Sequence, residues 1–297
     1  MLPLKKLYID SRDRTADSKS SSNFKIELPY TVEMPDNTVF FVTDVCIPNV
    51  WQTIETGFND RLYLYFRGPD IMNGQYVQTV QQTYKVVTLD QNNYTLAALA
   101  EEIQKKLRAA LDPYMISAGA SFNVTFNGLS NSLTITMTGS NTSCSFRLLT
   151  DQDVQLSLSP ILAKSISWVG DSIDPGNLKS ANGVISHAVM MLPTMSWTSG
   201  FVNLQHIHNI YITSPNLGSF DTISTFSNNI IKKVPITGAY GMMIVDQLMS
   251  TNDYLNCSKQ TLRTLEFHLR DGRGNEVDLK GMPISFSLVF NKYSGDL

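Results

Sequence analysis

Apolar and polar residues alternate along much of this chain. The alternation is clearest at residues 24–28, 62–66, 265–270 and 284–291. A period of two places one set of side chains on a buried face and the other on an outer face, as in a β-strand. The last two runs are separated by the turn-rich segment 271–275, so we expect them to be antiparallel strands. The pattern predicts a mainly β protein with antiparallel sheets.

One segment departs from this alternation. Between Thr95 and Leu111 apolar residues recur at the spacing of a helix, at Leu96, Leu99, Ala100, Ile103, Leu107, Ala110 and Leu111. Acidic residues come early in the segment and basic residues late, which suits the helix dipole. We predict a helix that Asp112-Pro113 ends, because the residue before a proline avoids the α region.

Strand patterns flank this helix on both sides. We expect a strand at 84–89 before it and two more at 122–126 and 133–137 after it. Asn127-Gly128 lies between the latter two, and this dipeptide favours a hairpin. Together these elements predict an α+β insertion domain at residues 70–165.

The segments on either side of the insertion are expected to form one discontinuous β domain, residues 23–69 and 166–297. Insertions are tolerated in loops whose ends lie close together. Residues 1–22 include the Ser-rich run 18–22 and few apolar side chains. Such a segment buries little surface by itself, so we expect an N-terminal arm that becomes ordered only on assembly.

The composition narrows the classes of partner. Hydrophobic residues make up 42% of the chain and charged residues only 16%, with a net charge of -3. The charge argues against a nucleic-acid-binding surface, which normally shows a basic stripe. The low charge content suits a surface pressed against neighbouring subunits, and equally a β protein with an uncharged polar coat. No apolar stretch approaches the ~20 residues that cross a bilayer, so we expect no membrane contact.

The sequence contains few of the motifs and residues that catalysis uses. Neither a GxSxG nucleophile motif nor a phosphate-binding Walker loop occurs. His206 and His208 have a spacing that can bind a metal on a strand, but no carboxylate or cysteine flanks them closely, so we interpret them as ordinary strand histidines. The three scattered cysteines predict no disulfide framework and a reducing compartment, and we expect no signal peptide, enzymatic activity, metal or cofactor.

Two blocks, at the beginning and the end of the chain, carry a distinctive succession of segments. The first, Tyr8 to Phe66, opens with Tyr-Ile-Asp-Ser-Arg-Asp-Arg-Thr and continues through the strand-like segments 24–29 and 39–51. The second, Asn209 to Phe290, contains the segments 230–236, 262–271 and 283–288. In this succession the sequence resembles the penton (minor capsid, vertex) proteins of virophages, polinton-like viruses and adintoviruses.

The resemblance implies a fold and a role. The fold would be a single antiparallel jelly-roll β-sandwich with an added domain, and the two flanks offer about the number of strands that it needs. The protein would be a structural protein of the virion, made in the host cytoplasm and not secreted. It would form homopentamers at icosahedral vertices, contact the double jelly-roll major capsid protein, and need no cofactor. Attachment to a host receptor through the insertion domain is a further hypothesis.

Other virion surface proteins remain an alternative, namely a fibre, a cement protein or a glycan- or receptor-binding β-sandwich. As candidate subunit-interface residues we select Arg12 and Arg14, in the expected arm, and Trp51 and Trp197, beside loops. Core packing is the alternative for both tryptophans. A cluster of methionines in the C-terminal half is interpreted either as core filler or as an interface: Met190, Met191, Met195, Met242, Met243 and Met249.

Overall fold

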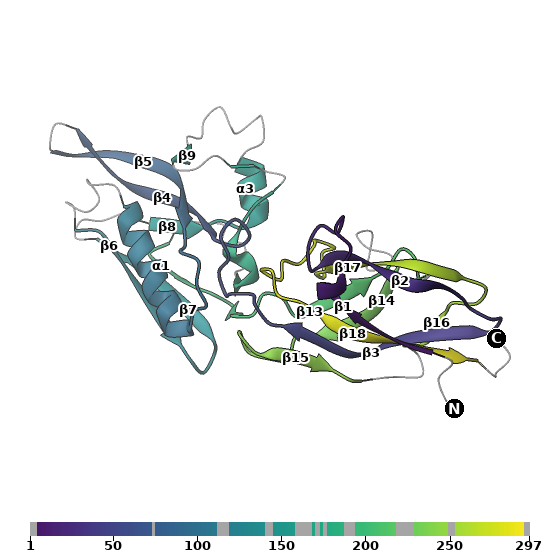
Figure 1. Cartoon of the computed structure of the whole chain (residues 1–297). Coiled ribbons are helices and arrows are strands. Elements are labelled where there is room, and N and C mark those ends of the chain that lie inside the picture. Colours follow the sequence, from purple (N-terminus) through teal and green to yellow (C-terminus); the bar gives the residue numbers. More distant parts are fainter. Residues whose placement is uncertain are drawn as a thin grey trace. The chain divides into compact units, whose positions relative to one another are not determined.

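The chain divides into two compact units (Figure 1). The computed structural model describes residues 5–72, 75–111, 119–139, 145–157, 168–169, 173–174, 177–186, 194–217, 229–248 and 253–293. The first unit, the sandwich unit, combines Met1–Trp51 with Ile207–Leu297. The second, the insertion unit, is Gln52–His206. Both are rich in strands, which confirms the mainly β prediction.

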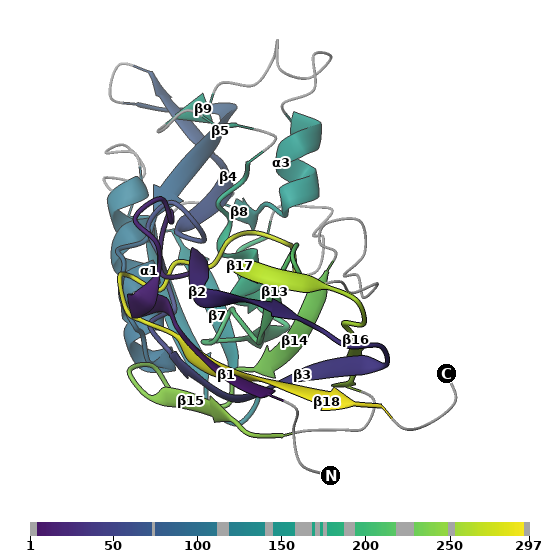
Figure 2. The same ribbon diagram turned by 45° about the vertical axis from the view of Figure 1, so that its right-hand side comes forward.

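Two antiparallel sheets make up the sandwich unit (Figure 2). Sheet A has the order β1 (Lys5–Asp10), β18 (Ser285–Lys292), β3 (Thr38–Pro48) and β15 (Met243–Asp246), and β16 (Leu255–Asn256) also pairs with β3. Sheet B has the order β14 (Ile230–Pro235), β13 (Asn209–Thr213), β17 (Thr261–Arg270) and β2 (Asn23–Glu33). A 3-10 turn, η1 (Ser11–Asp13), follows β1.

The strand order identifies the topology. Along the chain, β1 lies in sheet A, β2 in B, β3 in A, β13 and β14 in B, β15 in A, β17 in B and β18 in A. Neighbours in each sheet are therefore mostly distant in sequence, as in the two interlocked Greek keys of a jelly roll. The first strand pairs with the last, from Lys5 opposite Phe290 to Asp10 opposite Ser285. This confirms the predicted fold class, with both ends of the chain in one sheet.

A dry core lies between the two sheets. Aromatic rings from both sheets meet there: Phe24 and Phe267 have ring centroids 5.5 Å apart, and Phe267 and Phe286 are edge to face at 5.0 Å. Phe40 and Phe290 add a second pair at 5.9 Å. All five rings are buried. Because alternate residues of each strand point inward, the period of two in the sequence is the direct cause of this core.

In the structure residues 5–22 belong to the sandwich unit, which differs from the separate arm expected for residues 1–22. Ile9 of β1 is buried in the core, and the Ser11 amide donates to the carbonyl of Ile284 at 2.9 Å. The Ser-rich turn is held along β2, where the amides of Thr15 and Ser20 donate to the carbonyls of Lys25 and Asn23. The physical reason is that the apolar residues among 5–10 alternate with polar ones, and that turn hydrogen bonds satisfy the polar run.

The insertion unit contains two larger sheets. One has the order β8 (Ser145–Leu148), β4 (Arg61–Met72), β5 (Gln75–Thr88) and β9 (Trp168–Val169). The other has the order β11 (Ser196–Thr198), β7 (Ser132–Thr138) and β6 (Ser121–Asn127). The small elements are β10 (Ile185–Ser186) paired with β12 (Phe201–Val202), the helix α3 (Asp151–Ser157) and the 3-10 turn η2 (Ala181–Gly183).

The predicted helix is present as α1 (Leu96–Ala110). Thr95 caps its first turn, because its hydroxyl accepts a hydrogen bond from the Ala98 amide at 3.2 Å. Leu99, Ile103 and Leu107 are fully buried in the core of the insertion unit. None of the helices among the described residues is long and apolar enough to cross a bilayer.

The boundaries of the insertion differ from those expected at residues 70 and 165. The structure places them at Trp51/Gln52 and His206/Ile207. Strand β4 pairs along its length with β5, and β11 pairs with β7, so residues 61–69 and 196–198 belong to the insertion unit. The alternation at 62–66 identifies a strand correctly, but a period of two carries no information about which sheet the strand joins.

Candidate assembly surfaces

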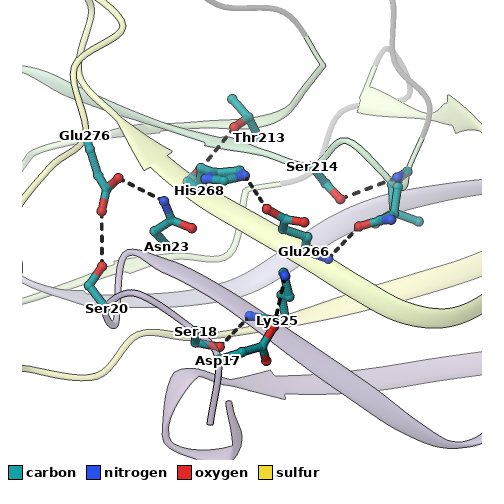
Figure 3. Close-up of polar contacts among 12 residues, drawn as sticks. Asp17, Ser18, Ser20, Asn23, Lys25, Thr213, Ser214, Glu266, His268 and Glu276 are labelled. Atoms are coloured by element: carbon teal, nitrogen blue, oxygen red, sulfur yellow. Dashed lines mark hydrogen bonds and ion pairs between the residues drawn. The ribbon is translucent and has the colours of Figure 1, made fainter. Parts of the chain in front are cut away.

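The outer face of sheet B carries charges of both signs, and several of them pair with one another. Lys25 on β2 lies directly opposite Glu266 on β17, and its ammonium group donates to Asp17 at 3.0 Å (Figure 3). Farther along the same two strands, Arg263 donates to Glu27 at 2.7 Å. Such exposed pairs contribute little to stability, but they leave this face without a strong net charge of either sign.

A polar network continues across β2, β17 and the loop that follows β17 (Figure 3). Glu276 accepts hydrogen bonds from Asn23 at 2.9 Å and Ser20 at 3.1 Å. His268 contacts the carboxylate of Glu266 through Nε2 at 3.1 Å. Its other ring nitrogen, Nδ1, is buried and has no hydrogen-bond partner among the described residues. Burial lowers the pKa of His268, and the neighbouring Glu266 opposes this shift.

One edge of the sandwich, formed by β1 and β2, carries exposed tyrosines, and we call it the tyrosine edge. Tyr8 on β1 is 78% exposed and Tyr30 on β2 is 58% exposed. Lys5 donates to the Tyr30 hydroxyl at 3.0 Å, and Lys6 lies 5.0 Å from the centroid of the Tyr8 ring. Aromatic rings with cations beside them combine apolar area with positive charge, which suits a contact surface.

The opposite edge, formed by β14 and β15, carries exposed apolar side chains, and we call it the methionine edge. The exposed fractions are 61% for Met242, 54% for Met243, 55% for Val245 and 78% for Leu248. Tyr240, at 45%, lies just before them. A short sheet edge with this much exposed apolar surface is normally an interaction site or an aggregation hazard.

A buried ion cluster fastens the methionine edge. Lys232 of β14 is 8% exposed, and its Nζ lies 3.6 Å from Asp246 of β15 and 3.7 Å from Asp253. It also donates to the carbonyl of Leu248 at 2.7 Å. The cluster joins the last strand of sheet B to the last strand of sheet A. Its Lys232 and Asp246 side chains are buried, so the side chains that β15 exposes are apolar.

The two arginines selected from the sequence are both exposed, with local partners. Arg12 forms an ion pair with Asp10 at 2.6 Å, which lowers the pKa of the Asp10 carboxyl. Arg14 donates to the carbonyl of Ser11 at 2.9 Å. Both side chains frame the turn after β1, next to the tyrosine edge. Their role at an interface stays a prediction.

The two selected tryptophans lie inside the two cores. Trp51 is 6% exposed in the sandwich core and donates from Nε1 to the carbonyl of Asp278 at 2.9 Å. Trp197 is 4% exposed in the core of the insertion unit. Core packing was the alternative that the sequence left open for both. Neither indole offers surface to a second molecule in this structure.

The methionine edge is the feature that sequence reasoning did not resolve. The pattern left core filler and interface equally open, and the structure exposes Met242 and Met243, with Met195 of the insertion unit at 40%. Met190, Met191 and Met249 lie outside the described residues. A signal was present in the segment 240–248, where the side chains on both sides of Ile244 are apolar and only one set can face the core.

No catalytic or metal-binding constellation appears in the described part of the chain. Its residues contain no group of three or more His, Cys, Asp or Glu side chains that could hold a metal ion. His206 packs against Phe58 in the insertion unit, whereas His208 belongs to the sandwich unit. Cys46 and Cys257 are free, and burial raises the pKa of the Cys257 thiol to about 11, which makes it unreactive. Cys144 is outside the described residues.

A shallow depression of about 310 Å³ lies on the insertion unit beside α1. Its lining includes Asp90, Tyr94, Glu102 and Lys105. Glu102 accepts a hydrogen bond from the Asp90 amide at 3.1 Å, and Lys105 and Lys106 lie near both carboxylates. The acids are thus engaged by structural partners, and the arrangement indicates surface packing of the helix.

Comparison with known proteins finds a likeness to a solved structure. No family model matches this chain, and no curated protein matches it. Among solved structures the chain is similar to the crystal structure of the SeMet-labelled mavirus penton protein, with 13% sequence identity and a TM-score of 0.44. The alignment covers 97% of this chain and 100% of that chain. That molecule is a penton protein, the class that the two terminal blocks of this sequence resemble.

Proposed function

We propose that this protein is a structural capsid protein that assembles into closed homopentamers at the vertices of an icosahedral virion. The observation that carries the proposal is that the two sequence blocks with the penton-like succession of segments fold into one jelly roll, in which β1 pairs with β18. The two sequence blocks that resemble penton proteins, Tyr8 to Phe66 and Asn209 to Phe290, contain nearly all of that sandwich. Jelly rolls occur in viral capsids and in lectins, so the sequence resemblance, and not the fold, selects the capsid role.

The surfaces of the sandwich support assembly as the mode of action. A ring built head to tail needs two different patches on each subunit, and the tyrosine and methionine edges are two such patches. The charged outer face of sheet B is internally paired, so it offers no strong attraction for nucleic acid. The proposed partners are other copies of this chain and the double jelly-roll major capsid protein.

The insertion unit is a compact body with its own core, carried in one connection of the sandwich. We assign it, within the same proposal, to contacts outside the ring, with a host receptor as the candidate. Its hairpin tip supports this, since Leu129 is fully exposed and Phe126 beside it is 51% exposed. Virions whose vertex protein lacks residues 52–206 should assemble but bind host cells less; unchanged binding would remove the receptor role.

Native mass spectrometry of the purified full-length chain tests the proposal. Five copies are expected, and negative-stain micrographs of the same sample should show rings. Three copies would instead favour a fibre or a main shell protein. A particle that stays monomeric at high concentration, alone and mixed with the major capsid protein, would contradict the ring.

A further inference from the structure

The two ends of sheet A expose complementary surfaces. At one end, β1 presents Tyr8, and Tyr30 of β2 lies beside it. At the other end, β15 presents Met243 and Val245. Within the described residues β1 pairs only with β18, and β15 pairs only with β3, so each strand has one side without a backbone partner there. Open edges of this kind are templates for contact with another chain.

Strand direction allows a repeating contact between these edges. Sheet A has four strands along its path, and every adjacent pair is antiparallel. Because the number on the path is even, β1 and β15 run in opposite directions. A second copy rotated about an axis along the strands would therefore place its β1 antiparallel to β15 of the first. A cyclic ring can repeat this contact without reversing any subunit.

The chemistry of the two edges is also complementary. Thioether and branched apolar side chains on the methionine edge match tyrosine rings, since sulfur–aromatic contacts are favourable. The exposed side chains of the methionine edge are uncharged, because Lys232 and Asp246 are buried beneath them. The two edges therefore match through apolar and aromatic surface.

We propose that the methionine edge of one copy packs on the tyrosine edge of the next copy, head to tail, and that this contact closes the ring. The inference rests on the proposed function, because it names the surfaces through which that ring would form. The occupant of each edge is a second copy of this chain.

Two variants of the full-length chain block one edge each. Val245→Asp places a carboxylate in the middle of the methionine edge, and Tyr8→Asp does the same on the tyrosine edge. Both positions are exposed, at 55% and 78%, so each variant should fold with a circular dichroism spectrum like that of the wild type. Leu156→Asp, at a position of α3 in the insertion unit that is 56% exposed, is the matched control and should assemble like the wild type.

The mixture of the two variants provides the decisive measurement by native mass spectrometry. Each variant alone should be monomeric, because no subunit can use both edges. Mixed one to one, they should form heterodimers and nothing larger, because one intact edge of each kind remains. Homodimers of either variant, or rings that persist in both, would overturn the inference. If the wild type forms no ring either alone or mixed with the major capsid protein, the proposed function fails. If the wild type forms rings and the variants do too, only the edge assignment fails.

A milder substitution tests the methionine edge with less risk of misfolding. Met243→Gln keeps the length of the side chain and removes its apolar end, and it should raise the concentration at which rings dissociate by about tenfold. An unchanged dissociation concentration for this variant would also count against the methionine edge.

Discussion

At the scale of single residues, His268 is expected to make the stability of the fold depend on pH. Its Nε2 contacts Glu266, its Nδ1 is buried with no partner in the part of the chain that the structure describes, and burial lowers its pKa in the folded chain. The groups around it are Glu266 and Arg270 on its own strand, Lys25 and Asn23 on β2, Thr213 on β13, and Glu276. Because the unfolded chain then binds the proton more readily than the folded chain, the stabilising contribution is present above the ordinary histidine pKa and is lost as the pH falls below it.

We therefore predict that the free energy of unfolding of the wild type decreases between pH 7 and pH 5. The variant His268→Gln should not show this decrease. Glu266→Gln should enlarge the decrease, because the carboxylate that favours the protonated ring is gone while the burial remains. Urea unfolding at several pH values, followed by circular dichroism, measures both. An identical pH dependence in the wild type and His268→Gln would refute the assignment.

Lys232 gives a second prediction at this scale. Removing its ammonium in Lys232→Met leaves Asp246 buried without its cation, which should destabilise the sandwich by about 3–5 kcal/mol. The double variant Lys232→Met/Asp246→Asn should recover much of the loss, since the neutral amide can still accept the hydrogen bond from the Leu248 amide. Urea titrations of the three proteins decide the matter; equal stability of the two variants would show that charge burial is not the cause.

The sequence reveals such residues only in part. Lys232 lies in a mostly apolar strand, and the sequence around it does not identify Asp246 as its partner. That pairing depends on the two sheets meeting at one edge. Trp51 and Trp197 show the same limit, since a large aromatic residue beside a loop fits a core as well as an interface. The exposure of Met243 likewise follows from the position of β15 at the end of a sheet.

Strand β1 shows what alternation can and cannot predict at the scale of an element. The residues that face inward, Leu7 and Ile9, alternate with Lys6 and Tyr8, yet the Ser-rich run after them suggested a disordered arm. The strands predicted at 24–28, 62–66, 265–270 and 284–291, and helix α1, were found correctly from their periods of two and 3.6. Their order within the sheets, and the membership of β4 in the insertion unit, depend on contacts between distant segments, which a local pattern does not encode.

A pair of neighbouring substitutions tests whether β1 is part of the fold. Ile9→Ala should reduce the free energy of unfolding by about 2–5 kcal/mol, because Ile9 is 2% exposed in the core. Tyr8→Ala, on the outer side of the same strand, should change it by less than about 1 kcal/mol. Thermal and urea unfolding of both variants provide the values. If the two variants prove equally stable, β1 contributes no core packing and the arm interpretation returns.

At the scale of the whole molecule, two separate cores indicate two units that fold independently. The buried cluster of the sandwich and the cluster of the insertion unit share no residue. The chain passes between the units at Trp51/Gln52 and at His206/Ile207. A long insertion in a surface connection costs the host fold little, since each doubling of loop length adds only about 0.6 kcal/mol of closure entropy.

This organisation predicts that the sandwich survives removal of the insertion. A chain in which a flexible Gly/Ser linker replaces residues 52–206 should fold, because β3 and β13 keep all their partners within sheets A and B. Differential scanning calorimetry of the full chain should show two transitions, and the shortened chain should retain one of them within a few degrees. Since both edges of sheet A lie in the part that is kept, the shortened chain should also form rings of the same number of copies. Loss of the cooperative transition would show that the insertion unit completes the sandwich core. A shortened chain that folds but forms no rings would show that the ring contact lies on the insertion unit and not on the edges of sheet A.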